Sequence, residues 1–267
     1  MEDHEPFVER ILHKLVRKHI AGTTMDSALA VAKQLNSSSI PASITFLSGN
    51  VIDKSKAKYN ATAYAELVRR IARAGIKSSI HVKLEQLGSE VDTQIALDNM
   101  GSVAEACGKY GIFLWVEPDG LDKPLVSKIT KMKGVGLALE AAKAGDYMKG
   151  IGKVNSLKLS FKEYNSKDPK EISRMLADMN KNVGNIVVSS MNEKLLWKVA
   201  SSKQKADVTF EFGLGYSSSK MKKAVKKGTK ISVLVPFGKD WIKYAMNNVP
   251  EAYMRFVAGR RLKAGVA

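Results

Sequence analysis

The stretch ADVTFEFGLGYSSSKMKKAVKKGTKISVLVPFG (206–238) contains the repeating unit that decides the fold. A β-rich run (206–213) is followed by an amphipathic helical pattern (218–230) and then by a second β-rich run (230–238). Strand, helix and strand in this order predict two parallel strands joined by a crossover helix.

The same unit recurs along the chain, with helical patterns such as 57–75, 91–111 and 168–182 between the β-rich runs. Six further runs precede the two already quoted: PASITFLSG (41–49), KSSIHVKLEQLG (77–88), IFLWVEP (112–118), VGLALEA (135–141), VNSLKLSF (154–161) and NIVVSSM (185–191). Eight strands at this spacing predict an α/β fold, a closed (β/α)8 TIM-like barrel. An open doubly wound sheet is the alternative, but the first strand is not followed by the Gly-x-Gly-x-x-Gly turn common in that fold.

We expect a single domain over 1–267, with N-terminal helices in 1–36 and the barrel in 37–267. The second of these helices, TTMDSALAVAKQL, has Thr23 or Thr24 as its expected cap. No apolar run approaches the roughly 20 residues of a membrane span, and the N-terminus does not resemble a signal peptide. The single cysteine, Cys107, is expected to be buried, and the lack of a disulfide framework favours a cytoplasmic location.

The positive charge is concentrated in the second half of the chain. Residues 1–142 carry 18 Lys and Arg against 16 Asp and Glu, whereas residues 143–267 carry 25 against 10. The net charges are therefore +2 and +15, out of +17 for the whole chain. A field this asymmetric favours a polyanionic partner, although a solvated lysine-rich surface would have the same composition.

The densest basic segment is the helix predicted within 218–230. Its lysines form two rows on one face, while Met221, Ala224 and Val225 would face the barrel. The candidate nucleic-acid-binding residues are Lys220, Lys222, Lys223, Lys226, Lys227 and Lys230, joined near the C-terminus by Arg255, Arg260, Arg261 and Lys263. Such a face could bind the phosphates of RNA or of a ribosome without sequence-specific geometry. A solvated helix face and an acidic membrane surface are the alternatives.

Several segments, in order and spacing, resemble the proline dehydrogenase family from about Ile20 to Arg261. They are IAGTTMDSAL, IHVKLEQLG, YGIFLWVEPD, FEFGLGY and VLVPFGKDWIKYAM. The resemblance implies a flavin-dependent barrel that oxidises proline, with FAD over the strand ends and a C-terminal helix over the barrel mouth.

The catalytic positions that the resemblance implies are only partly retained. The substrate-contacting lysine of the second strand is matched by Lys83, and the tyrosine of the final helix by Tyr244. The two arginines that grip the substrate carboxylate in the family correspond to Asn247 and Asn248, and neutral amides cannot replace that contact. The aspartate of the third strand corresponds to Val116, or to Glu117 after a shift of one residue.

The flavin positions are altered as well. The resemblance assigns candidate cofactor contacts to Glu140, Lys158 and Ser190, where the family has a glutamine, an arginine and a threonine. The histidine that follows that threonine is replaced by Met191, and the glutamine after the seventh strand by Gly213. We therefore expect the chemistry to be degraded and no cofactor to be needed, with FAD remaining possible through the resemblance.

Other chemistry has weaker support in the sequence. No histidine, cysteine or carboxylate cluster has metal-ligand spacing, so no metal is expected. His81 shares a strand face with Lys83 and is expected to be packed in the interior. The loop GYSSSK (215–220) fits a phosphate site or a simple helix cap equally well. Two hypotheses remain: a catalytically inactive barrel that binds RNA or a ribosome, and an active FAD-dependent proline dehydrogenase or related amine oxidoreductase acting on a small molecule.

Overall fold

The computed structural model describes residues 17–49, 51–118, 120–121, 123–149, 153–161, 169–179, 181–190, 192–201, 207–241 and 244. Eight parallel strands in this part of the chain pair in sequence order, and β8 pairs with β1 to close the barrel. The strands are β1 (Ala42–Phe46), β2 (Ser78–Lys83), β3 (Leu114–Glu117), β4 (Val135–Glu140), β5 (Val154–Phe161), β6 (Val183–Ser190), β7 (Val208–Gly213) and β8 (Ile231–Phe237). The predicted (β/α)8 barrel is confirmed.

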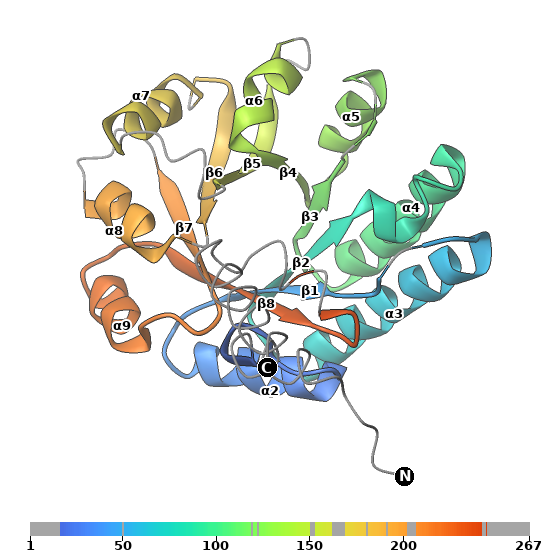
Figure 1. Ribbon diagram of the computed structural model, residues 1–267, viewed down its shortest axis with the longest axis horizontal. Helices are drawn as coiled ribbons and strands as arrows, with labels where there is room; N and C mark the ends of the chain where they lie inside the picture. The colour runs from blue at the N-terminus through green and yellow to red at the C-terminus, as the bar shows by residue number, and fades with distance from the viewer. Residues whose placement is uncertain are drawn as a thin grey trace, which may run out of the picture.

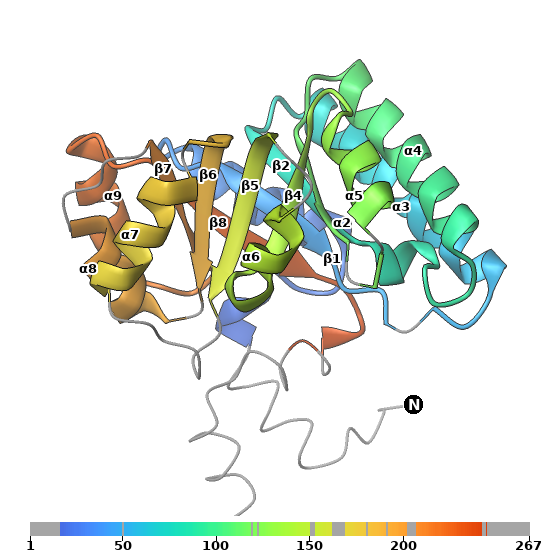
Figure 2. The same cartoon turned by 90° about the horizontal axis from the view of Figure 1, so that it is seen from above.

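Helices surround the barrel on its outside, as the ring of coiled ribbons in Figure 1 shows. The α-helices are α2 (Met25–Asn36), α3 (Lys54–Arg73), α4 (Thr93–Lys109), α5 (Lys123–Thr130), α6 (Ala141–Met148), α7 (Pro169–Met179), α8 (Glu193–Ser201) and α9 (Ser218–Lys226). Two short 3-10 helices are η1 (Arg17–His19) and η2 (Leu84–Leu87). The side view of Figure 2 shows α6 and α7 on the outer side of β5 and β6.

The strands separate two chemically different layers, because successive side chains of a strand point to opposite faces. The outward side chains, such as Ile80, Val116 and Leu159, are buried against the helices in one large apolar core. The inward side chains include His81, Glu117 and other polar residues that contact one another across the barrel. The apolar core therefore lies between barrel and helices, and the polar groups lie inside the barrel.

Local sequence signals account for most helix boundaries. Thr24 is the N-cap of α2 and accepts a hydrogen bond from the backbone N–H of Ser27, as one of the two expected caps. Asp53 and Asp92 cap α3 and α4 in the same way, since their carboxylates accept hydrogen bonds from free N–H groups of the first turn. Cys107 is buried on the inner face of α4, as predicted.

The β-rich run 77–88 extends past the strand that it contains. β2 ends at Lys83, within the expected strand end, and the chain then turns into η2. Gly88 closes that turn with φ 104°, a left-handed conformation that favours glycine. A Cβ at this position would also lie 2.9 Å from the Cβ of Ala57. The apolar residues after Lys83 belong to a tight turn, which the alternation of side chains along a strand does not predict.

Candidate functional site

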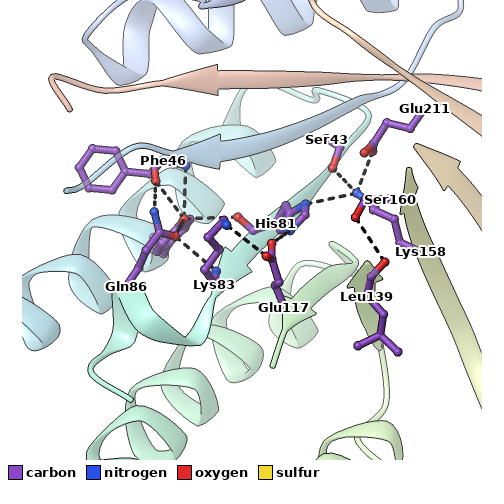
Figure 3. Close-up of polar contacts among 11 residues, drawn as sticks. Ser43, Phe46, His81, Lys83, Gln86, Glu117, Leu139, Lys158, Ser160 and Glu211 are labelled. Atoms are coloured by element: carbon purple, nitrogen blue, oxygen red, sulfur yellow. Dashed lines mark hydrogen bonds and ion pairs between the residues drawn. The ribbon is translucent and has the colours of Figure 1, made fainter. Parts of the chain in front are cut away.

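A line of polar contacts crosses the inside of the barrel, from Lys83 through Glu117 and His81 to Lys158 and Glu211 (Figure 3). These residues come from β2, β3, β5 and β7. All of them occupy positions that point inward, because the pairing register places Lys83 beside Glu117 and His81 beside Trp115. Charged side chains from four strands therefore meet inside the barrel.

Lys83 and Glu117 lie at the carboxyl ends of β2 and β3, the end at which barrel enzymes bind their ligands. The Nζ of Lys83 is 3.1 Å from Oε1 of Glu117, and Nε2 of His81 is 3.4 Å from Oε2 of the same carboxylate. Burial raises the pKa of Glu117, but the hydrogen bond to His81 and the charge of Lys83 outweigh this effect and hold the pKa well below its usual range. The Lys83 side chain is 43% exposed, so the mouth presents a partly accessible cation.

Lys158 and Glu211 form a second ion pair deeper in the barrel. Their side chains are both 1% exposed, and Nζ lies 2.8 Å from Oε2. The same Nζ donates to Oγ of Ser43 at 3.1 Å and lies 5.0 Å from the centre of the Trp115 ring. Burial lowers the pKa of Lys158, against the opposing attraction of Glu211. This ammonium group is therefore fully engaged by the protein.

His81 lies between the two ion pairs. Its Nδ1 is 3.5 Å from Nζ of Lys158, and its other ring nitrogen faces Glu117. Burial lowers the pKa of His81, and the positive charge of Lys158 lowers it further. A neutral imidazole is therefore the form that fits this place. The sequence favoured a packed histidine, and the ring does point inward, where it also links the two pairs.

A buried network behind Lys83 fixes the end of β2. The Gln86 side chain donates to the carbonyl of Phe46 at 2.6 Å and accepts from the Tyr64 hydroxyl at 2.9 Å. Its Oε1 also accepts from the backbone N–H of Lys83 at 3.3 Å. Asn60 donates to the Gln86 carbonyl at 2.8 Å. The Lys-x-x-Gln part of the segment therefore holds the backbone from which Lys83 projects (Figure 3).

The third-strand carboxylate is Glu117, not Val116. Val116 points outward into the apolar core with no exposed surface, while Glu117 points into the mouth. The shift of one residue changes the face because side chains alternate along a strand. Of the two positions that the resemblance leaves open, Glu117 is the one that places a carboxylate beside Lys83.

The three candidate cofactor residues do not form one cluster. Lys158 is held by Glu211 and Ser43. Ser190 is buried and faces outward, where its hydroxyl donates to the Phe161 carbonyl and accepts from the N–H of Asn192. Glu140 is half-buried at the end of β4, where α6 begins.

The remaining mouth candidate, Tyr244, is within the described residues and is half-buried. Burial raises its pKa, and the nearby Tyr216 and Glu211 raise it further. Asn247 and Asn248 lie outside the described residues, as does most of the predicted C-terminal helix.

The basic helix has the predicted orientation. Met221 is 2% exposed, and Ala224 and Val225 pack against the core. The lysines of α9 and the turn after it are all exposed: Lys220, Lys222, Lys223, Lys226, Lys227 and Lys230. Lys230 forms an ion pair with Asp207, while none of the other five has an ion pair with a described residue. Arg255, Arg260, Arg261 and Lys263 lie outside the described residues.

The loop 215–220 was predicted to hold phosphate or to cap a helix. Ser217 is the N-cap of α9, without a side-chain hydrogen bond to the helix. The preceding residues contact the N-terminal segment instead, since Nδ1 of His19 lies 2.6 Å from the Leu214 carbonyl and its ring packs against Tyr216.

Two residues of the interior were missed by the sequence analysis, Trp115 and Glu211. Trp115 stands two residues before Glu117, and Glu211 two residues before Gly213, so strict alternation places both inside the barrel. The alternation that places Trp115 and Glu211 inside was therefore present in the sequence. The side chains that they contact come from other strands, and only barrel closure brings them together.

Comparisons with known proteins agree with the barrel. No protein-family model matches the chain. Proline dehydrogenase 1 of Bacillus subtilis (strain 168) is 22% identical over 259 residues, which covers 88% of this chain and 86% of that protein. Proline dehydrogenase 2 of Bacillus subtilis subsp. natto is 21% identical over 266 residues, covering 88% and 85%.

Solved structures of proline utilization A have the same fold. The protein from Bdellovibrio bacteriovorus, inactivated by N-propargylglycine, superimposes with a TM-score of 0.64 at 14% identity over 90% of this chain. The protein from Corynebacterium freiburgense gives a TM-score of 0.63 at 11% identity over 97% of this chain. The chain spans about a third of the length of these proteins, 33% and 35%.

Fold and site together define a (β/α)8 barrel with a charged interior and a lysine–carboxylate pair at its mouth. Within that class, the chain is similar to proline dehydrogenases in sequence, at 22% identity, and shares the barrel fold of proline utilization A.

The family implies FAD, and the described residues do not fit it at the assigned positions. The Nζ of Lys158 is within hydrogen-bonding distance of three side chains inside the barrel, so it has no N–H group left for a ligand at the strand ends. Ser190 is turned away from the barrel interior. The third position, Glu140, would place an anion near a ring system that gains negative charge on reduction.

The described residues contain no group of three His, Cys, Asp or Glu side chains arranged to hold a metal ion. None of the described helices combines the length and the apolar character that crossing a membrane requires.

Proposed function

We propose that this barrel binds RNA, free or in a ribonucleoprotein such as the ribosome, through the lysines of α9, and does not oxidise proline. One observation carries the proposal: five lysines of one helix and its C-cap are exposed, and none has an ion pair with a described residue. They are Lys220, Lys222, Lys223, Lys226 and Lys227. The cytoplasmic location predicted from the sequence is part of the same proposal.

The contrast with the barrel interior supports this reading. Inside the barrel, Lys83 and Lys158 each lie within 3.1 Å of a carboxylate oxygen. The α9 lysines lack such carboxylates, so an external anion is their available counter-charge. From residue 220 to 227 the helix rises by about 10 Å, which lets several ammonium groups contact one phosphate chain. The anchor of the helix, Met221, faces the core and leaves the lysine face free.

The sequence positions that correspond to the family's arginine pair also favour a changed role. Asn247 and Asn248 stand where the resemblance requires two guanidinium groups that bind a carboxylate. A neutral amide cannot supply the charge of that contact. The basic C-terminal residues Arg255, Arg260, Arg261 and Lys263 would add to RNA binding rather than to catalysis.

The proposal is tested by RNA binding of charge-reversal variants. The variant Lys222→Glu, Lys223→Glu, Lys226→Glu, Lys227→Glu should bind single-stranded RNA at least about tenfold more weakly in a filter-binding assay, because it converts a cationic face into an anionic one. The matched control reverses four charges on α3 and α4, across the barrel from α9 in Figure 1: Lys54, Lys58, Arg73 and Lys109.

The control distinguishes a local face from the effect of total charge. Both variants change the net charge by the same amount, so equal losses would mean that only the overall field matters and would contradict a site on α9. Unchanged binding in the α9 variant, or no salt-sensitive binding of RNA or ribosomes by the wild type, would also reject the proposal.

The second candidate function is an FAD-dependent proline dehydrogenase or a related amine oxidoreductase. The observation that favours it is Lys83, which lies partly exposed at the mouth beside Glu117 in a barrel of this family. Lys83 would bind the carboxylate of a small amino acid there. If the protein takes up added FAD and the flavin is bleached by L-proline, and if Lys83→Met abolishes that bleaching, this candidate replaces the first.

A further inference from the structure

A cavity of about 600 Å³ opens at the end of the barrel opposite to the mouth. Its lining comes from the amino-terminal parts of the strands, for example Ser79 of β2, Thr209 of β7 and Ser232 of β8. Family ligands are expected at the carboxyl ends of the strands, so this cavity lies at the other end of the barrel from Lys83 and Glu117, although Glu211 belongs both to its lining and to the polar line. Its volume lies in the range of small-molecule sites.

The inner part of the cavity is aromatic. Phe113 and Trp115 line it, with ring centres 4.8 Å apart and planes tilted by 56°. Both rings lie over Gly136, where a Cβ would be only 2.6 Å from the Trp115 ring and 2.9 Å from that of Phe113. Glycine at this position of β4 therefore leaves the space that the two rings occupy. Val187 packs beside them. This wall suits a flat apolar ring.

The same cavity contains unused hydrogen-bonding groups. Glu211 lines it and is 1% exposed, and its Oε1 has no hydrogen-bond partner among the described residues. The side chains of Ser79, Thr209 and Ser232 also make no hydrogen bond within the described part of the chain. A buried acceptor without a partner is costly, so a ligand donor that reaches Glu211 would be strongly favoured.

Charge decides which donor fits. Glu211 is already balanced by Lys158 at 2.8 Å, so a cationic ligand group would leave a net buried positive charge. A neutral N–H group satisfies Oε1 without that cost. At the rim of the cavity stand two exposed lysines, Lys77 and Lys230. Lys230 is paired with Asp207, so Lys77 is the cation that suits an anionic group on the outer part of the ligand. The ligand therefore combines a flat ring, a neutral amine and an anion.

We propose that this cavity binds a nucleoside monophosphate whose base carries an exocyclic amine. The base lies against Phe113 and Trp115, its amine donates to Oε1 of Glu211, and the phosphate meets Lys77 at the rim. This site goes beyond the RNA-binding face on α9, since Lys77 and the aromatic wall lie outside that helix.

The ligand side of the proposal is tested by calorimetry with three probes. AMP should bind. Purine riboside 5′-monophosphate, which lacks only the exocyclic amine, should bind about tenfold more weakly because Oε1 keeps no partner. Adenosine, which lacks the phosphate, should also bind more weakly. Equal affinities for AMP and purine riboside monophosphate, or no saturable AMP binding at millimolar concentration, would overturn the proposal.

The protein side is tested with two exposed or half-buried positions of the cavity. Lys77→Glu should weaken AMP binding several-fold and leave adenosine binding unchanged, while Ser232→Leu should remove both by filling the cavity. Retained thermal unfolding temperatures verify that the variants fold, and Glu211 stays untouched because it also holds Lys158. Lys222→Glu on α9 is the control: it should bind AMP like the wild type, and a loss equal to that of Lys77→Glu would reduce the effect to surface charge and reject the site.

RNA binding and AMP binding can fail separately. A protein that binds AMP but no RNA keeps the cavity site and loses the proposed function. A protein that binds RNA through α9 but no AMP keeps the function and loses the cavity site.

Discussion

Among single residues, the buried pair Lys158–Glu211 differs most from what the sequence predicted. Lys158 was assigned to a cofactor, yet it lies inside the barrel with a carboxylate from β7, 53 residues further along the chain. Only barrel closure brings the two together, so no local pattern could reveal it. Glu117, by contrast, was recoverable from alternation alone, because Val116 beside it must point to the opposite face.

The Lys158–Glu211 pair predicts a large effect on stability. Lys158→Met should lower the free energy of unfolding by about 3–5 kcal/mol, because it leaves Glu211 buried without a counter-charge. Adding Glu211→Leu should restore most of that loss, as measured by denaturant unfolding. The exposed pair Lys181–Asp178 is the control, since Lys181→Met should change stability by less than about 1 kcal/mol. A mild effect of Lys158→Met alone would contradict the buried pair.

His81 predicts a specific pH dependence of stability. Its pKa is lowered by burial and by Lys158, with Glu117 and Glu211 acting in the opposite direction, so the unfolded chain binds this proton more readily than the folded one. Stability is therefore retained above the ordinary histidine pKa of about 6.5 and falls as the pH drops below it. His81→Gln should flatten the decline of unfolding temperature between about pH 7 and 5. A variant with the same slope as the wild type would show that His81 is not responsible, and His19→Gln serves as the comparison, because the pKa of His19 is also lowered by burial.

Among the elements, strands and helices followed the sequence where alternation or amphipathic spacing was regular. The predicted strand 154–161 coincides with β5, and Met221 of α9 packs against the core as expected. The β-rich run 77–88 extends past the end of β2, because Gln86 folds back onto the Phe46 carbonyl and turns the chain into η2. A tertiary hydrogen bond decides that boundary, so neighbouring residues alone could not predict it.

The two faces of α9 should respond differently to substitution. Reversing Lys222, Lys223, Lys226 and Lys227 should leave stability nearly unchanged, because these side chains are exposed. Met221→Ala should instead cost about 2–5 kcal/mol, since it removes a buried side chain from the core. Thermal unfolding of the two variants compares them directly. If the charge reversal destabilised the protein as much as Met221→Ala, the RNA-binding variant could not be read as a surface change.

At the level of the whole molecule, the sequence predicted the closed barrel and the family resemblance, because eight regular β/α units carry both. The function needed more than that. Retained positions such as Lys83 point to the family's chemistry, while Lys158 and Ser190 are engaged by protein groups. Residues 143–267 carry a net charge of +15, and among the described residues of this half the basic side chains are densest on α9. The proposed role therefore belongs to the outer surface of an inherited barrel.

The most direct test of this account is the salt dependence of RNA binding by the wild type and by the α9 variant. Each phosphate contact to single-stranded RNA contributes about −0.7 to the slope of log K against log salt concentration, so engagement of four or five lysines predicts a slope of about −3 to −3.5. Reversal of Lys222, Lys223, Lys226 and Lys227 should remove most of that slope, while reversal of four charges on α3 and α4 should preserve it. A wild-type slope near zero, or a slope unchanged by the α9 reversal, would contradict the account.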